Sequence, residues 1–424
     1  RDMANQAIDQ GGGFDAFNFR VPEVVREAIG IRLNGLSESC NQVLRTAAVI
    51  GRKFEFRLLT LARPDLQEDE LLDALEEVLG SGAIREIPGE LERYEFSHAL
   101  IQETLSNELS SSRRARLHAR ILEAIETSIE AEAESGRSDG DHRISELAFH
   151  SAQAELIVGT EKVIHYARRA GEVAMGSYAW ADARLYFEKA LSLDESKGPS
   201  ENRAAILFGL GAAELISLTF PDVQRGWDNV ERSFDLYAEL GDQKAAVDVL
   251  VRVRGFPTVW IHGASRAYSM ALEMVPPGSI EAGQMLLQLE HLKRFDEQDV
   301  AGSLQDLEQA LEIAKNTDDR VLESQVLPQI AWNMSYAGDL KGAIEVGTRA
   351  IELTQETEQP LEEQSAQFIA GLSNFAIGNH EDALRNAGNL QLIGEKFGQL
   401  QILVGDYWIK YNVAYLSGDV EVIA

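Results

Sequence analysis

The sequence predicts a mostly α-helical protein, in which a small N-terminal domain precedes a long array of paired helices, an α-solenoid. Two observations lead to this fold class. Apolar residues recur at helical spacing along most of the 424 residues, apart from two alternating segments near residue 90 that are typical of a β-hairpin. Late in the chain, turn residues recur at forty-residue intervals, which indicates stacked repeats.

The first elements predict a compact domain at residues 21–110, after a linker at residues 1–20. The linker contains three consecutive glycines and no helical period. Capping serines and prolines mark where the helices of the domain begin. The first helix is expected to begin at Val21, and the second to run from Ser37 or Ser39 to Gly51. A third is expected over about 55–62 and a fourth over about 68–79.

A hairpin completes this domain. Residues 83–87 and 92–96 alternate around Pro88-Gly89-Glu90, so three helices are followed by a two-stranded wing, which is a winged-helix pattern. Many winged helices bind DNA through the helix before the wing. Here that helix, residues 68–79, carries six carboxylates and no basic residue, so a phosphate backbone would be repelled. We therefore expect an internal docking module.

The second predicted strand ends at Phe96, and His98 opens the next helix. A helix start has unpaired N–H groups and the positive end of the helix dipole, which suit a phosphate, and the histidine would add a contact to the same anion. Alternatively, His98 simply caps the helix or packs against the wing. The phosphate-binding pattern Gly-x4-Gly-Lys-Ser/Thr is absent from the sequence, so we expect no ATP hydrolysis by this chain alone.

Residues 111–142 predict a connecting helix and an exposed joint. Ser111 or Ser112 is expected to cap the helix, whose basic start either contacts an anion or forms a solvated face. Residues 143–424 then predict tetratricopeptide-like helical repeats. Ala183, Phe187 and Ala190 have the spacing of the second helix of such a repeat.

Later repeats have a period of forty residues. Turns are expected in one register at Gly338-Asp339, Gly378-Asn379 and Gly418-Asp419, and the register extends back to Asp299. We therefore expect the chain to stop within a repeat of a longer protein. Residues 254–263 interrupt the helical period. They form either a loop that lines a ligand site or a distorted helix pair with Trp260 in the core. Stacked repeats form a superhelix, and its concave surface is the expected site for a protein, peptide or small inducer.

Four sequence segments stand out, at residues 21–29, 47–54, 96–105 and 113–118. They resemble the winged-helix region of bacterial STAND signalling ATPases, which are AAA-type, NACHT-like proteins. Such ATPases occur with class III adenylate cyclases, with some kinases and with LuxR-type regulators such as the maltose-regulon activator. The resemblance covers residues 21 to about 125 closely and the helical remainder loosely.

The resemblance implies a role for His98. In that family, the histidine at this helix start contacts the β-phosphate of ADP and holds a resting state, and His98 matches this position. It also implies an ATPase domain ahead of residue 21, ATP or ADP with Mg²⁺ as cofactor of the full-length protein, and self-association on activation. No catalytic residue and no metal ligand are expected in this chain.

The composition excludes several classes of function. With 69 acidic and 39 basic residues the formal net charge is −30, so we expect no direct binding of nucleic acid or of anionic membranes. The single cysteine, Cys40, is expected to be buried rather than nucleophilic. No apolar run approaches the roughly 20 residues of a membrane span, so we expect a cytoplasmic protein. The hypotheses are a sensor part of a STAND ATPase or a repeat scaffold with no nucleotide role.

Overall fold

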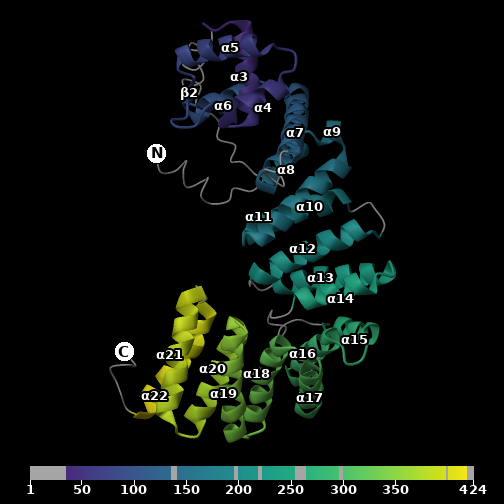
Figure 1. The fold of residues 1–424 in the computed structure, drawn as a ribbon, viewed down its shortest axis with the longest axis vertical. Helices are drawn as coiled ribbons and strands as arrows, with labels where there is room; N and C mark the ends of the chain where they lie inside the picture. Colours follow the sequence, from purple (N-terminus) through teal and green to yellow (C-terminus); the bar gives the residue numbers. More distant parts are fainter. Residues whose placement is uncertain are drawn as a thin grey trace. The chain divides into compact units, whose positions relative to one another are not determined.

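The structure is a computed structural model (Figure 1). It describes residues 35–134, 141–194, 199–217, 222–253, 264–295, 299–397 and 400–417. The predicted linker at residues 1–20, the helix at Val21, the interruption at 254–263 and the turn at Gly418 lie outside these ranges.

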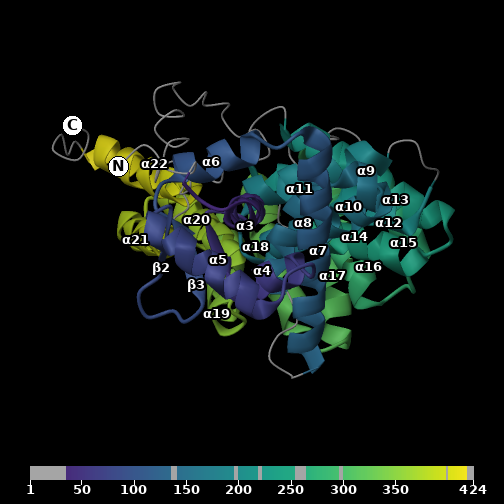
Figure 2. The same ribbon diagram turned by 90° about the horizontal axis from the view of Figure 1, so that it is seen from above.

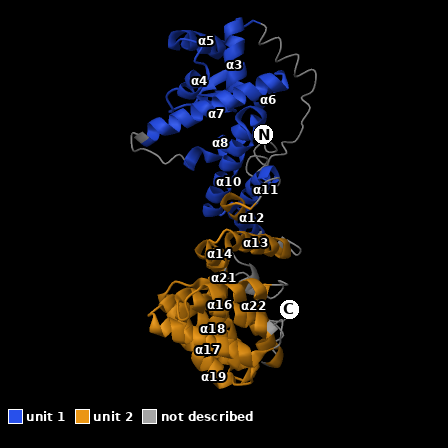
Figure 3. Ribbon diagram, turned by 90° about the vertical axis from the view of Figure 1, so that its right-hand side faces the viewer, with its two compact units in different colours: residues 1–198, 205–217 blue, residues 199–204, 218–424 orange. Residues whose placement is uncertain are grey.

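The chain divides into two compact units (Figure 3). The first unit comprises residues 1–198 and 205–217, and the second comprises residues 199–204 and 218–424. The domain boundaries predicted at residues 110 and 142 fall inside the first unit and stay predictions.

The first unit begins with helices whose ends follow the predicted signals. The Ser37 hydroxyl accepts a hydrogen bond from the Cys40 N–H at the start of α3, and Gly51 follows the last residue of that helix. Cys40 is buried, as predicted. The helices of this unit are α3 (Glu38–Ile50), α4 (Phe56–Ala62), α5 (Glu68–Ser81), α6 (Ala99–Asn107), α7 (Ser111–Glu134), α8 (Ile144–Gln153), α9 (Glu155–Val158), α10 (Thr160–Gly176) and α11 (Trp180–Asp194), with a 3-10 turn η1 (Asp141–Arg143) before α8 and most of α12 (Glu201–Ser217) after α11.

The predicted hairpin is part of a three-stranded antiparallel sheet. Its strands are β1 (Lys53–Glu55), β2 (Ile84–Glu86) and β3 (Arg93–Phe96), in the order β1-β3-β2. The prediction of two strands therefore missed β1, which pairs Phe54 with Tyr94. Three residues are too few to show an alternating pattern, and the partner strand lies forty residues away, so local sequence does not reveal this pairing.

Helix α7 connects the sheet-containing part to the repeats and is visible along its length in Figure 2. Along its apolar face Leu117, Ile121, Leu122 and Ile125 are buried, and Ile129 is half-buried. The cap is Ser110, whose hydroxyl accepts from the Arg113 N–H at 3.4 Å, one residue before the predicted pair. The helix continues to Glu134, into the first part of the predicted joint.

The tetratricopeptide-like spacing in α11 is explained by its packing. Phe187 is buried between α10 and α12, and its ring lies where a Cβ atom of Gly171 or Gly209 would be. A side chain at either glycine would approach the ring to 2.8 or 2.3 Å, which is a clash. The large residue of the repeat thus requires small residues on both neighbouring helices.

In the second unit, the helices from α17 onward repeat every twenty residues (Figure 1). Their first residues are 300, 320, 340, 360, 380 and 400, so the predicted forty-residue period is two equivalent half-repeats. The helices of this unit are α13 (Asp222–Glu239), α14 (Gln243–Arg252), α15 (Ala264–Met274), α16 (Ile280–Phe295), α17 (Val300–Asn316), α18 (Arg320–Tyr336), α19 (Leu340–Glu356), α20 (Pro360–Ala376), α21 (His380–Phe397) and α22 (Leu400–Ser417). We call α16–α22 the helical array.

The turns of the helical array share one geometry. The residue two before the start of α18, α19, α20 and α21 has a positive φ angle, at Asp318, Gly338, Glu358 and Gly378. At Asp319 and Asp339 the next side chain caps the helix by accepting from the N–H three residues later, at 2.8 and 3.0 Å. The sequence signals only the turns with glycine, because aspartate and glutamate in this conformation are uncommon.

Consecutive helices of the array pack against each other, and the even-numbered helices also pack together. Helix α18 contacts α16 and α20, and α20 contacts α22, whereas direct contacts between α17, α19 and α21 are sparse. We call α16, α18, α20 and α22 the inner layer, because helices on the inside of a curved stack approach each other most closely. Among the described residues, no helix has both the length and the apolar character that crossing a membrane demands.

Candidate functional site

The structure places His98 between a fixed strand and a fixed helix. Its backbone is extended, with φ −140° and ψ 136°, and α6 begins at the next residue. Before it, the Ser97 hydroxyl donates to the Gly82 carbonyl at 2.8 Å, and Phe96 is fully buried. After it, the Gln102 amide donates to the Ala48 carbonyl at 2.6 Å and ties α6 to α3. His98 is therefore held on a rigid base.

The His98 ring itself is exposed. It neither caps α6 nor makes any other hydrogen bond with the part of the chain that the structure describes. His98 thus occupies the N-cap position of α6 through its backbone, whereas its ring makes no capping hydrogen bond. The ring and the first N–H groups of α6 are available to an external anion, and the phosphate contact stays a prediction.

The surface of α5 is acidic, as the sequence predicts. Glu68, Asp69, Glu70, Asp73 and Glu76 are all exposed on this helix. Glu77 accepts a hydrogen bond from the Ser37 N–H at 2.8 Å. An exposed row of carboxylates repels a phosphate backbone, so this geometry agrees with the expectation that α5 does not bind DNA.

The basic residues at the start of α7 differ in exposure. Arg113, Arg116 and Arg120 are exposed, Arg114 is half-buried, and none of the four forms an ion pair with any described residue. A contact of these arginines with an anion stays a prediction. His118, which the sequence grouped with them, is buried, and its Nδ1 lies 2.8 Å from Nδ1 of His150 in α8. Burial lowers the pKa of His118 to about 4 and that of His150 to about 3, so both rings are neutral and one donates to the other.

A second candidate site is a row of aromatic side chains along the inner layer, which we call the aromatic strip. It consists of Trp332 and Tyr336 of α18, Phe368 and Phe375 of α20, and Trp408 of α22. The ring centroid of Trp332 lies 5.8 Å from that of Tyr336 and 5.7 Å from that of Phe368. Phe375 meets Trp408 edge to face at 5.9 Å. The strip thus crosses three neighbouring inner helices.

The aromatic strip is open to solvent at both ends. Tyr336 is 58% exposed and Trp408 is 44% exposed, and the Trp332 indole N–H is held by the Ser365 hydroxyl at 3.0 Å. Beyond Trp408, the exposed rings of Tyr411 and Tyr415 stack at 6.4 Å. The sequence contains part of this signal, because Phe375 and Tyr415 lie one forty-residue period apart, but this spacing does not show that the aromatic rings share a surface.

Next to the strip, the array contains a buried polar cluster. Glu290 of α16 is fully buried and accepts a hydrogen bond from the Ser303 hydroxyl at 2.9 Å. Its other oxygen lies 3.6 Å from Arg294, a distance that is too long for a hydrogen bond. Burial raises the pKa of Glu290 to about 7 in spite of the attraction of Arg294. Burial and Arg294 lower the pKa of the neighbouring His291 to about 4.

Comparisons with known proteins give weak similarities. No protein-family model matches the chain. An uncharacterized protein of Rhizobium meliloti (strain 1021) is 28% identical over 172 residues, which are 40% of this chain and 16% of the relative, so the chain spans a small part of that relative's length.

Two solved structures are similar at low TM-score. A Signal Transduction ATPase with Numerous Domains (STAND) protein with a tetratricopeptide repeat sensor, from Pyrococcus horikoshii, has a TM-score of 0.42 and 15% identity over 95% of this chain and 64% of its own. Aspartyl phosphate phosphatase F from Bacillus subtilis has a TM-score of 0.36 and 15% identity over 92% of this chain and 82% of its own. The chain thus spans less than two thirds of the first of these structures.

Proposed function

We propose that the helical array binds a protein or peptide signal along the aromatic strip. The observation that carries this proposal is the exposure of aromatic rings at the ends of the strip and beyond it, at Tyr336 of α18 and at Trp408, Tyr411 and Tyr415 of α22. Aromatic side chains supply large contact areas at little cost in conformational entropy and are enriched in protein interfaces. A partner that covers the strip removes this apolar surface from water.

A peptide-binding experiment tests this role. Linear peptides selected from a displayed random library on the 424-residue chain should lose about tenfold or more in affinity for Trp408→Ala, because aromatic anchors carry much of an interface's free energy. Tyr178→Ala is the matched control, since Tyr178 is exposed but lies outside the array. Selected peptides that bind both variants equally well would exclude the strip as the site.

We further propose that the chain is the regulatory part of a STAND signal-transduction ATPase. In this proposal residues 21–110 are a winged-helix domain that docks on an ATPase domain ahead of residue 21. ATP or ADP with Mg²⁺ is the cofactor of that domain, and His98 contacts the phosphate of bound ADP. The exposed His98 ring on its rigid base and the resemblance of residues 21–125 support this role.

A signal that prefers the open form would shift the population away from the ADP-held resting state. To change a resting population of about 99% into an active one, the signal must prefer the active form by roughly 5 kcal/mol. Self-association of the active form would then transmit the change to a cyclase, kinase or transcription output.

The role of His98 is tested in the protein that carries the ATPase domain. His98→Ala should weaken ADP retention, which is measured as nucleotide released from the purified protein, and should raise basal output. Gln102→Ala is the comparison, because it loosens the base of α6 without removing the ring. If His98→Ala retains ADP and stays silent as the unaltered protein does, the role assigned to His98 is wrong.

A further inference from the structure

A pocket of about 360 Å³ lies in the first unit between the small sheet and the start of α8. We call it the sheet pocket. Its apolar side is formed by Ile50, Phe54, Leu58 and Ile87, which come from α3, from the sheet region and from α4. The pocket is distinct from the surroundings of His98, which does not line it.

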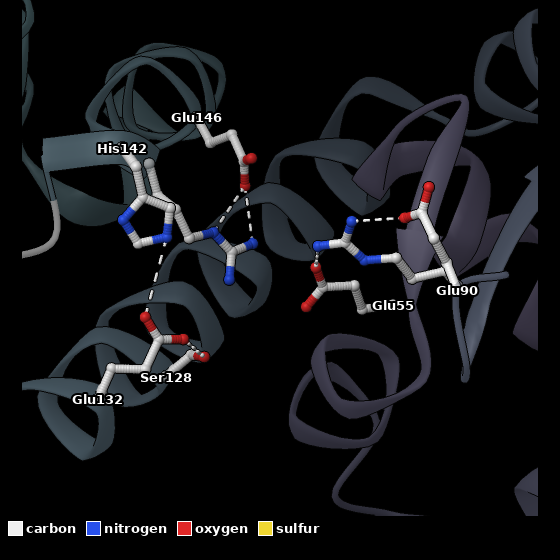
Figure 4. Close-up of polar contacts among 8 residues, drawn as sticks. Glu55, Glu90, Ser128, Glu132, His142 and Glu146 are labelled. Carbon is white, nitrogen blue, oxygen red and sulfur yellow. Dashed lines mark hydrogen bonds and ion pairs between the residues drawn. The ribbon is translucent and has the colours of Figure 1, made fainter. Parts of the chain in front are cut away.

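The polar side of the sheet pocket contains three cationic side chains from three elements. Lys53 comes from β1, Arg93 from β3 and Arg143 from the residue that precedes α8. Figure 4 shows Glu146 on one side and Glu55 and Glu90 on the other. Arg143 donates to Glu146, and Arg93 donates to Glu55 and Glu90. Three carboxylates, those of Glu55, Glu90 and Glu146, line the same pocket, so the formal charges of its lining cancel.

Arg143 is the best shielded of these cations. Its side chain is only 10% exposed, and its Nε and Nη2 donate to a single oxygen of Glu146 at 3.1 and 2.7 Å. Nη1 donates to no described residue, although a guanidinium has five N–H groups to satisfy. Arg143 also forms the N-terminal cap position of α8, so the positive end of that helix lies beside it.

The remaining cations are held loosely. Arg93 bonds Glu90 at 2.7 Å and also bonds Glu55, but all three side chains are at least 40% exposed. Lys53 makes no ion pair within the described ranges. Glu146 is 49% exposed, so an incoming anion can replace it on Arg143 while its carboxylate moves into water. Exposed ion pairs of this kind are worth less than about 1 kcal/mol and are readily exchanged.

We propose that the sheet pocket binds a small organic anion, in which a phosphate or carboxylate is joined to an apolar body. The anionic group bonds Nη1 of Arg143 and the Lys53 ammonium, and the apolar body packs against Phe54 and Leu58. The planar fork of a guanidinium suits both anions, which accept two parallel hydrogen bonds. This site is independent of the role proposed for His98 and of the aromatic strip.

Calorimetric titration of the 424-residue chain with three probes tests the chemistry. Phenyl phosphate combines the anion with an apolar body, inorganic phosphate lacks the body and phenol lacks the charge. Phenyl phosphate should bind at least about tenfold more tightly than either of the others, since both halves of the pocket contribute. Equal affinity of phenyl phosphate and phenol would overturn the proposal, and so would a lack of phenyl phosphate binding at millimolar concentration.

Substitutions test the assignment of residues. Lys53→Gln and Arg143→Gln should each weaken phenyl phosphate about tenfold, whereas Glu146→Gln should strengthen it, because the competing carboxylate is gone. Arg85→Gln is the matched control, since Arg85 pairs with Glu95 on the same sheet outside the pocket. Lys53 and Glu146 are exposed, so these variants decide the question even if Arg143→Gln does not fold. Unchanged affinity in both Lys53→Gln and Glu146→Gln contradicts the site.

Discussion

The sheet-containing part of the first unit and the helical array of the second are each stabilised by a different kind of contact. In the former, essential contacts join residues far apart in the chain, such as Phe54 with Tyr94 and Gln102 with Ala48. In the latter, α17, α18 and α19 are each capped by an aspartate of the preceding turn, and consecutive helices pack against each other. A domain with long-range contacts should unfold as one body, whereas a stack with neighbour contacts responds locally.

The two units also differ in how they bury ionisable groups. The first unit buries the His118–His150 pair as neutral rings. The second holds the half-buried His291 beside the fully buried Glu290, and burial lowers the pKa of the histidine while it raises the pKa of the glutamate. The response of each unit to pH should therefore differ in size.

The largest effect is expected from Phe96→Ala. Phe96 is fully buried in the core of α3, α5 and the sheet, so its loss should destabilise that domain by about 3–5 kcal/mol. Hydrogen exchange should accelerate throughout α3–α6, whereas protection in α17–α22 should be unchanged. Leu91→Ala is the control, because Leu91 is 93% exposed. Equal loss of protection in the array would show that the two regions unfold together.

Acidification should destabilise the first unit more than the second. A histidine whose folded pKa is lowered keeps its stabilising contribution above the unfolded pKa of about 6.5 and loses it as the pH falls. Two such groups, His118 and His150, should remove about 4 kcal/mol between pH 7 and pH 5. Hydrogen exchange, corrected for the intrinsic rate at each pH, measures the change in both units.

In the second unit two effects oppose each other. His291 should remove about 2 kcal/mol over the same range, while Glu290, whose folded pKa is raised, should restore a similar amount as it takes up its proton. Glu290→Gln removes the compensation, so this variant should make the array acid-sensitive too. An array that is equally insensitive to acid with glutamine at this position would contradict the assignment.

A smaller and local effect is expected from Asp339→Ala. The Asp339 carboxylate caps α19 through the Gly342 N–H, and its loss should cost about 1 kcal/mol. Faster exchange should be confined to α19 and the helices that it touches, α18 and α20. Lys341→Ala serves as the control, since Lys341 is exposed in the same first turn and does not cap it.

The smallest change in stability is expected from Trp408→Ala. Trp408 is 44% exposed and makes one edge-to-face contact with Phe375, so its loss should cost about 0.5–1 kcal/mol and urea denaturation should change little. Together with a loss of peptide affinity, this result separates the binding role of the strip from a structural one. A large drop in stability would instead identify Trp408 as part of the array's core.

The sequence predicted those features that depend on residues close in the chain. The helix from Ser37 to Gly51, the hairpin strands and the buried Ala183, Phe187 and Ala190 are all present. It failed where structure depends on distant residues or on rare conformations. Strand β1 needs its partner β3, and the turn at Asp318 adopts a positive φ angle without glycine.

For the candidate site, too, the sequence predicted what depends on neighbouring residues and missed what depends on distant ones. The position of His98 at a helix start follows from local pattern, whereas its exposure depends on how Phe96 and Gln102 are anchored. The burial of His118 depends on His150, thirty-two residues away, so a basic stretch was read as one surface. The sheet pocket joins β1, β3 and α8, which no linear pattern connects.

The direct packing of α18 against α20 and of α20 against α22 has a mechanical consequence. The inner layer is continuous while the outer helices scarcely touch one another, so the array is stiff along one edge and compliant along the other. A small change in the spacing of two inner helices then tilts every helix that follows. A ligand that inserts between Tyr336 and Trp408 would therefore displace the helices that follow, and this displacement would grow with distance along the stack.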